Sequence, residues 1–242
     1  MSRGQPDFGL YGSTPVASGI SDPGESAARL GSINVYDRRG WTVWMDDFEE
    51  PALKWAANAI GLGLAPVLST VRSYMGTQSL SFWTWAGAGA RSQASRAFSL
   101  IRLGRVGIEF TIYLGTSTPG YFRLYFRIYD GVNYADADLR LDSEARTATI
   151  ITPDGPEVVA TNCFRVGANR IWLPVKLVVD MDTDMYTRLL IGPQEIDLSP
   201  YALVAGLPTT ERLIEVFLQL QGDVAGDMEA NLDNFILTQN EP

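Results

Sequence analysis

Apolar and polar residues alternate one by one along most of the chain from Trp41 onward. Successive side chains of a β-strand point to opposite faces, so this pattern predicts strands with one buried face each. The apolar positions of the clearest runs are Phe110, Ile112 and Leu114; Phe122, Leu124, Phe126 and Ile128; Ala137, Leu139 and Leu141; Ile171, Leu173, Val175, Leu177 and Val179; and Ile214, Val216, Leu218 and Leu220.

Short turn sequences separate these runs. They combine Gly and Pro with Asp or Thr, residues that favour or permit turn conformations. Many strands joined by short turns predict an all-β fold, a two-sheet antiparallel sandwich or jelly roll. Residues 52–60 are the only helical candidate within this part of the chain. The turns are Thr118-Pro119-Gly120, Asp130-Gly131, Pro153-Asp154-Gly155, Asp180–Asp184 and Gly192-Pro193.

The first 40 residues lack the alternation. Residues 1–21 are rich in Gly, Ser and Pro and carry scattered apolar side chains, among them Phe8, Leu10 and Tyr11. Such a segment cannot bury its own apolar groups, and these three side chains suit docking onto another surface. Residues 22–31 carry the capping signals of a short helix, with a plain turn as the alternative. We predict an extended N-terminal arm, residues 1–40, and one β-domain, residues 41–242.

Composition excludes several kinds of chemistry. The 242 residues include no His and one Cys, Cys163. Without imidazole there is no Ser-His-Asp triad, no Cys-His pair and no His-ligated zinc, and one Cys cannot form an intrachain disulfide. The formal net charge of −9 argues against a nucleic-acid partner. No apolar run resembles a signal peptide or a membrane helix, so we expect no membrane partner.

Several segments together resemble a known family. Residues 45–49 (MDDFE) followed by Lys54-Trp55 open the domain, residues 172–180 lead through a turn into residues 186–189, and residues 232–237 (LDNFIL) close it. This order resembles the concanavalin A-like lectin and glucanase jelly rolls, and it implies that the first and last strands lie side by side. Residues 2–9 are also similar to the leader of phage-associated proteins that carry such a domain.

Two sets of outward-facing residues are candidate partner-binding sites. Trp83 and Trp85 lie on one face of a predicted strand, about 7 Å apart, where they could stack on successive sugar rings. As buried residues they would belong to the core or to a subunit contact instead. The second set alternates Arg and Tyr, which is typical of interfaces and of ligand-binding sheets, with a solvated outer face as the alternative. Its members are Arg123, Tyr125, Arg127 and Tyr129.

No catalytic or cofactor motif is present. Retaining glucanases of the family carry Glu-x-Asp-x-x-Glu on one strand, and here the nearest pair, Glu211 and Glu215, lacks the Asp. We therefore expect no catalytic residue and no cofactor, with Cys163 a small buried residue. A structural calcium site is the one alternative, because Asp47 or Glu49 would meet Asp233 where the first and last strands adjoin.

These observations favour a non-enzymatic structural protein. The leading hypothesis is a phage virion component, a capsid decoration or tail-associated subunit, made in the host cytoplasm and assembled with other copies and other virion proteins. Its support is the distinct arm and the predominance of Arg among the basic residues, since Lys54 and Lys176 are the only lysines. The alternative is a carbohydrate-binding module, which would have a glycan as partner. A divergent glycoside hydrolase is the third hypothesis.

Overall fold

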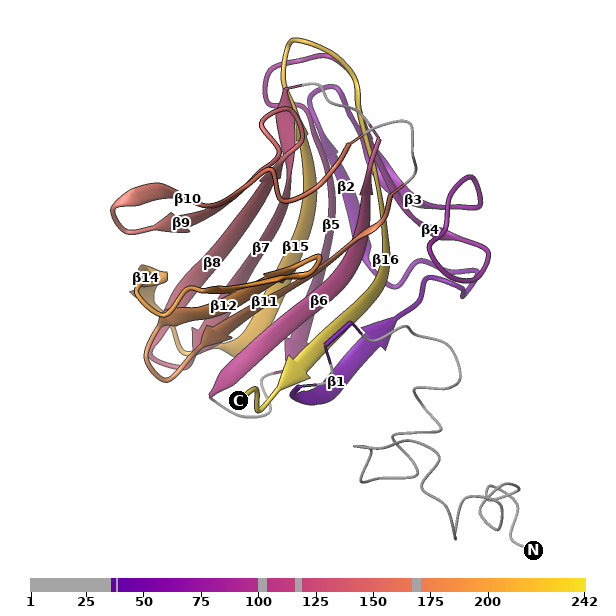
Figure 1. Ribbon diagram of the computed structural model, residues 1–242. Coiled ribbons are helices and arrows are strands. Elements are labelled where there is room, and N and C mark those ends of the chain that lie inside the picture. Colours follow the sequence, from indigo (N-terminus) through magenta and orange to yellow (C-terminus); the bar gives the residue numbers. More distant parts are fainter. Residues whose placement is uncertain (1–35, 38, 100–103, 116–118, 167–170) are drawn as a thin grey trace, which may run out of the picture. The chain divides into compact units, whose positions relative to one another are not determined.

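The computed structural model describes residues 36–242 except 38, 100–103, 116–118 and 167–170. Phe8, Leu10 and Tyr11 of the predicted arm, and the predicted helix at residues 22–31, lie outside the described residues. Within the described part the chain forms strands and no helix (Figure 1). It therefore contains no helix there that could cross a membrane.

The strands form two eight-stranded sheets in which all neighbours are antiparallel. Sheet A has the order β13-β12-β11-β6-β16-β4-β3, with β1 also paired to β16, and sheet B has the order β10-β9-β8-β7-β15-β5-β2, with β14 paired to β8. The predicted two-sheet antiparallel sandwich is confirmed. The strands are β1 Trp41–Asp46, β2 Ala56–Ile60, β3 Gly63–Ser69, β4 Ser79–Thr84, β5 Arg91–Ser99, β6 Arg105–Leu114, β7 Gly120–Asp130, β8 Asn133–Asp142, β9 Thr147–Thr152, β10 Gly155–Thr161, β11 Leu173–Asp180, β12 Met185–Ile191, β13 Gln194–Asp197, β14 Val204–Pro208, β15 Arg212–Gly222 and β16 Met228–Gln239.

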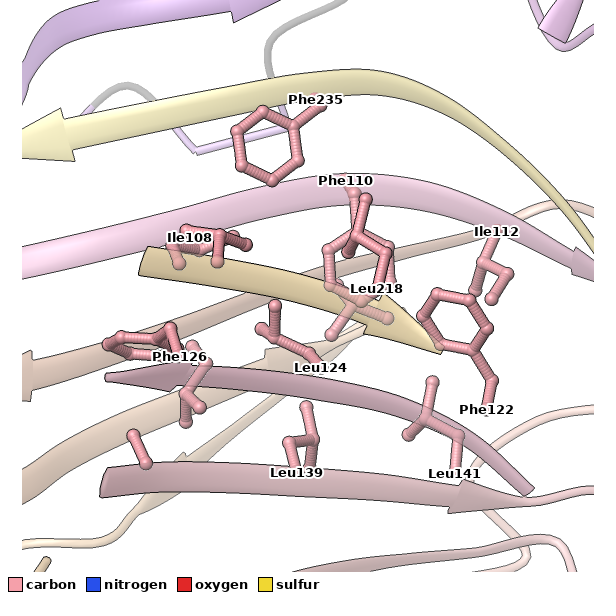
Figure 2. Close-up of a cluster of buried hydrophobic side chains, with 14 of the residues drawn as sticks. Ile108, Phe110, Ile112, Phe122, Leu124, Phe126, Leu139, Leu141, Leu218 and Phe235 are labelled. Carbon is pink, nitrogen blue, oxygen red and sulfur yellow. The ribbon is translucent and has the colours of Figure 1, made fainter. Parts of the chain in front are cut away.

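The core lies between the two sheets and contains the apolar residues of the alternating runs. Phe122, Leu124 and Phe126 of β7 and Leu218 of the neighbouring β15 point toward Phe110 of β6 (Figure 2), and all five are fully buried. Because these side chains point inward, the residues between them on β7 must project from the other side of sheet B.

The long antiparallel hairpins follow the predicted turns. Asp130-Gly131 joins β7 to β8, and Asp130 Oδ1 accepts hydrogen bonds from the backbone of Val132 and Asn133. The segment Asp180–Asp184 joins β11 to β12 as a hairpin turn. The first and last strands are neighbours, with Asp46 opposite Phe235. The last two strands occupy inner positions, since β15 lies between β7 and β5 and β16 lies between β6 and β4.

The helical candidate at residues 52–60 is wrong. Ala56–Ile60 forms β2, an edge strand that pairs with β5 and sets Ala57 opposite Ala94. Three alanines favour a helix locally, but the preceding Trp55 is anchored in the core, where its ring packs against Phe235 with centroids 4.8 Å apart. The tertiary contact and the ladder with β5 override the local propensity.

A buried ion cluster lies on the side of sheet A that faces away from the core. Lys176 of β11 has no exposed surface, and its Nζ lies 3.0 Å from Asp37 Oδ2 and 2.8 Å from Glu241 Oε1. The backbone carbonyl of Arg39 accepts a third hydrogen bond from Nζ at 2.9 Å. The cluster holds Tyr36, Asp37 and Arg39 against the sheet, together with Glu241 near the end of the chain. The sequence analysis placed the first three at the end of the arm.

Glu109 of β6 extends this cluster. Its carboxylate accepts hydrogen bonds from the backbone N–H of Tyr36 at 2.6 Å and of Asp37 at 3.1 Å, and it lies 4.0 Å from Lys176 Nζ. Burial raises the pKa of Glu109 to about 7, although these hydrogen bonds and the charge of Lys176 act to lower it. The pKa of Asp37 is lowered despite its burial, because Lys176 and Arg39 favour its charged form.

Candidate functional site

The outer face of sheet B carries a group of polar and aromatic side chains that come from several strands. On β7 the outward residues are those between the buried ones, so the pattern of the core fixes which side chains form this face. The register of β8, β15 and β5 brings further residues beside them. We define the sheet B face by Tyr121, Arg123, Tyr125, Arg127, Tyr129, Tyr134, Asp136, Asp138, Arg140, Glu215, Phe217, Gln219 and Gln93.

Two bidentate ion pairs organise this face. Arg123 donates from Nε and Nη2 to the two carboxylate oxygens of Asp138, at 2.9 and 2.7 Å. Arg127 binds Asp136 in the same way, at 2.7 and 3.0 Å. Parallel paired hydrogen bonds of this kind fix the guanidinium plane as well as the charge. The hydrogen bond to Asp136 raises the pKa of Arg127 further above its usual value.

Aromatic rings fill the space between these pairs. The rings of Tyr125 and Phe217 lie 5.3 Å apart, and those of Tyr129 and Tyr134 lie 5.8 Å apart. The guanidinium carbon of Arg127 lies 4.0 Å from the Tyr134 ring centroid, a distance typical of a cation–π contact. Burial raises the pKa of Tyr125 and of Tyr129. Both phenols therefore stay protonated at neutral pH and can donate hydrogen bonds.

The polar groups of the face are held in fixed positions. Gln219 is only 5% exposed although it belongs to the outer side of the sheet. Its Oε1 accepts a hydrogen bond from Arg123 Nη1 at 3.3 Å, and its Nε2 donates to Gln93 Oε1 at 2.6 Å. From Tyr121 to Tyr129 the face runs about 27 Å along β7. The arrangement is a long, rigid surface of alternating rings and hydrogen-bonding groups, with both signs of charge.

Sequence reasoning found the part of this face that comes from one strand. Arg123, Tyr125, Arg127 and Tyr129 lie together on β7, as predicted. The alternation within one strand does not show which residues of other strands lie beside it, so the residues from β8, β15 and β5 were missed. The turn at Asp130-Gly131 carried a usable signal, because a tight hairpin there fixes the register that sets Arg127 opposite Asp136.

The two predicted tryptophans lie on the other sheet. Trp83 of β4 and Trp85, just after it, belong to the outer side of sheet A, and Trp85 is 47% exposed. Their ring centroids are 5.6 Å apart, but the rings meet edge to face at 67°. They do not form one flat platform for successive sugar rings, and they belong to the other sheet from β7.

Two of the candidate calcium ligands, Glu49 and Asp233, accept hydrogen bonds from the loop between β3 and β4. Glu49 Oε1 accepts hydrogen bonds from the backbone N–H of Thr77 and of Gln78, at 2.8 and 2.9 Å. Asp233 Oδ2 accepts two more from Tyr74 and Met75. Burial raises the pKa of Asp233 to about 6. Among the residues that the structure describes, no group of three or more His, Cys, Asp or Glu is arranged to hold a metal ion.

Asp47, the other candidate ligand, caps the turn that follows β1. Its Oδ1 accepts a hydrogen bond from the backbone N–H of Glu49 at 3.2 Å. The described contacts of the three carboxylates are thus those of capping groups that hold loops at one end of the sandwich.

The remaining side chains considered for catalysis, Glu211, Glu215 and Cys163, do not lie together. Glu211 is exposed before β15, whereas Glu215 lies within β15 and its Oε2 is 3.4 Å from the Tyr129 hydroxyl. Cys163 is partly buried against the core, and burial raises the pKa of its thiol. A thiol with a raised pKa is a poor nucleophile at neutral pH.

Comparison with solved structures confirms the fold. An endo-β-1,4-glucuronan lyase from the fungus Trichoderma reesei matches with a TM-score of 0.59 and 11% identity, over 82% of this chain and 95% of that one. The cellulose induced protein Cip1 matches with a TM-score of 0.53 and 12% identity, over 81% and 97%. Lectin II from Ulex europaeus matches with a TM-score of 0.51 and 10% identity, over 81% and 97%.

The chain has the concanavalin A-like jelly-roll fold. At these identities the similarity shows the fold alone. No model of a known protein family matches the sequence, and no curated protein matches it.

The prediction of a phage virion protein is wrong. The similar structures are a polysaccharide lyase, a cellulose induced protein and a lectin, and their names point to glycans rather than to virion assembly. That prediction rested on the arm, of which residues 1–35 lie outside the described residues, and on the predominance of Arg among the basic residues. The arginines of β7 instead pair with aspartates of β8 inside one chain.

Proposed function

We propose that the protein is a carbohydrate-binding protein that holds a polysaccharide chain on the sheet B face. The observation that carries the proposal is the row of rings and bidentate Arg–Asp pairs along β7 and its neighbours. Sugar rings present apolar C–H faces and a rim of hydroxyls. Aromatic rings complement the apolar faces, and fixed carboxylates, guanidiniums and amides complement the hydroxyls.

The fixed positions of its side chains suit this face to binding an extended ligand. Hydrogen bonds between side chains already hold Arg123, Asp138 and Gln219 in place, so little side-chain freedom is lost when a ligand binds. The fold similarity to a glucuronan lyase and to a lectin is consistent with a glycan ligand.

Binding without cleavage is part of the proposal. A general base must have its pKa near the working pH, and the pKa values of Tyr125 and Tyr129 are raised instead. Incubation with glucuronan and with cello-oligosaccharides is therefore expected to release neither reducing ends nor unsaturated products. Release that is abolished by Tyr129→Phe would show that the face is an active site.

Tyr129→Ala and Phe217→Ala are each expected to weaken glycan binding at least tenfold, a loss of about 1.4 kcal/mol. Each change removes one ring from the face and leaves the ion pairs in place. The ligand would first be found on a glycan array that includes glucuronan and cellulose fragments. Titration calorimetry with the best oligosaccharide would then measure the dissociation constants.

Trp41→Ala is the matched control, because Trp41 is an aromatic residue on sheet A that is 67% exposed. It should bind as the unmodified protein does. Trp85→Ala tests the other aromatic surface. Loss of binding in Trp85→Ala with unchanged binding in Tyr129→Ala would place the site on sheet A and overturn the proposal, as would the absence of any bound glycan.

A further inference from the structure

The charges on the outer side of sheet B cancel. Its four inner strands, β8, β7, β15 and β5, carry four arginines and four carboxylates at their outward positions, so the formal charge of this surface is zero. The chain as a whole has a formal net charge of −9. Its excess of carboxylates therefore lies elsewhere in the protein. The eight residues are Arg91, Arg123, Arg127, Arg140, Asp136, Asp138, Asp142 and Glu215.

Asp138 occupies two of these arginines. All three guanidinium nitrogens of Arg123 already donate hydrogen bonds, Nε and Nη2 to Asp138 and Nη1 to Gln219. Arg140 Nη2 donates to Asp138 as well, at 3.1 Å. Asp138 is only 3% exposed. A ligand carboxylate could bind Arg123 in paired hydrogen bonds only by displacing Asp138, and a buried carboxylate that loses its cation is strongly destabilising.

Arg127 is occupied in the same way. Its Nε and Nη2 bind Asp136, and Nη2 also donates to the Tyr125 hydroxyl at 2.6 Å. Arg91 is the one arginine of the eight charged residues without a carboxylate partner in the described part of the chain. It lies at one end of a row across the sheet, and Asp142 at the other end of that row has the opposite charge. A polyanion on this surface would thus meet one unpaired cation rather than a row of them.

We propose that the sheet B face selects uncharged polysaccharides and rejects polyuronates. This inference rests on the proposed function and names the chemical class of its ligand. A neutral hexose carries a hydroxymethyl group at C6, which both donates and accepts hydrogen bonds and so can pair with carboxylates and with guanidiniums. A uronate carries a carboxylate there, which only accepts, and it would meet Asp136, Asp138 and Glu215 as like charges.

Net charge acts in the same direction. A chain with a formal charge of −9 repels a polyanion before contact, whereas an uncharged glycan approaches without this barrier. At contact, the carboxylates of the face disfavour a uronate because they leave it without a free cation to bind. Discrimination of this kind comes from the groups that the wrong ligand leaves unpaired.

The first test is the composition of the bound glycans on an array. They are expected to be uncharged, and a bound set dominated by uronate or sulfated glycans would overturn the inference. The array includes two pairs of hexasaccharides that differ only at C6, β-1,4-linked glucose with β-1,4-linked glucuronate and β-1,4-linked mannose with β-1,4-linked mannuronate. Titration calorimetry of the full chain is expected to give binding about tenfold or more tighter for the neutral member of a pair.

Asp136→Asn tests the cause of the preference. It keeps the size of the side chain and removes the charge that neutralises Arg127, so the glucuronate hexasaccharide should bind about tenfold or more tighter than it does to the unmodified protein. Added salt should weaken this gained binding, because it is electrostatic. Asp182→Asn is the matched control. It removes the same charge from an exposed carboxylate in the turn between β11 and β12 of sheet A, and it should leave the preference unchanged.

The outcomes separate this inference from the proposed function. Equal or tighter binding of the uronate member by the unmodified protein overturns the inference alone if Tyr129→Ala still weakens that binding. Loss of the uronate in Arg91→Gln would then assign anion recognition to Arg91. An unchanged preference in a folded Asp136→Asn variant, checked by thermal melting, also overturns it, because charge balance would not set the preference. If no glycan binds at all, the proposed function fails together with it.

Discussion

Lys176→Ala is expected to lower the free energy of unfolding by about 3–5 kcal/mol, the cost typical of removing one partner from a buried ion pair. The substitution leaves the carboxylates of Asp37, Glu109 and Glu241 near one another without the cation between them. It also removes the hydrogen bond to the Arg39 carbonyl. Urea denaturation followed by tryptophan fluorescence measures the loss.

Two further variants separate charge from packing. Lys176→Met keeps most of the side-chain volume and should still be strongly destabilised, because the missing charge is the main cause. Arg105→Ala removes a solvent-exposed ion pair with Asp180 on the same sheet and should cost less than about 1 kcal/mol. A loss below about 1 kcal/mol in both Lys176 variants would show that the cluster does not depend on its lysine.

The free energy of unfolding is expected to fall as the pH rises from about 4.5 to above 7. The pKa of Glu109 is raised from 4.5 to about 7 in the folded protein, so the folded state binds this proton more tightly than the unfolded chain does. The resulting stabilisation is complete below the unfolded pKa and is lost as the pH passes through 7. Its size is about 3 kcal/mol.

Asp233, with its pKa raised to about 6, acts in the same direction. Denaturation curves at pH 5 and pH 8 measure the sum of both effects. Glu109→Gln should flatten the pH dependence and Asp233→Asn should remove a smaller part of it. The buried acidic residues do not control stability in this way if the Glu109→Gln variant keeps the full slope of the unmodified protein.

The fold was predictable because it depends mainly on local pattern. Alternation identified the inward side chains of β7 and β8, and the turn sequences separated the strands. Residues 52–60 show where this reasoning fails. The helix propensity of the four alanines in this segment is local, whereas the pairing of β2 with β5 joins segments about 35 residues apart.

The candidate site was predictable only strand by strand. Arg127 and Tyr129 could be identified from alternation, but Phe217 and Gln219 reach the same face through the pairing of β15 with β7, about ninety residues later in the chain. The partners of Lys176 are similarly distant, since Asp37 and Glu241 come from opposite ends of the domain. No periodic pattern in a single sequence encodes such contacts.

The inner positions of β15 and β16 have a consequence for synthesis on the ribosome. In each sheet the strand that is synthesised last lies in the middle: β15 lies between β7 and β5, and β16 lies between β6 and β4. Until that strand is synthesised, the sheet consists of two separate parts. The nascent chain therefore cannot complete either sheet before residues 212–239 have left the exit tunnel. Until then one edge of each of the strands β4, β5, β6 and β7 stays open to wrong partners. Folding of the sandwich is thus expected to be slow, as non-local pairing dictates, and truncation within residues 212–239 should yield insoluble protein.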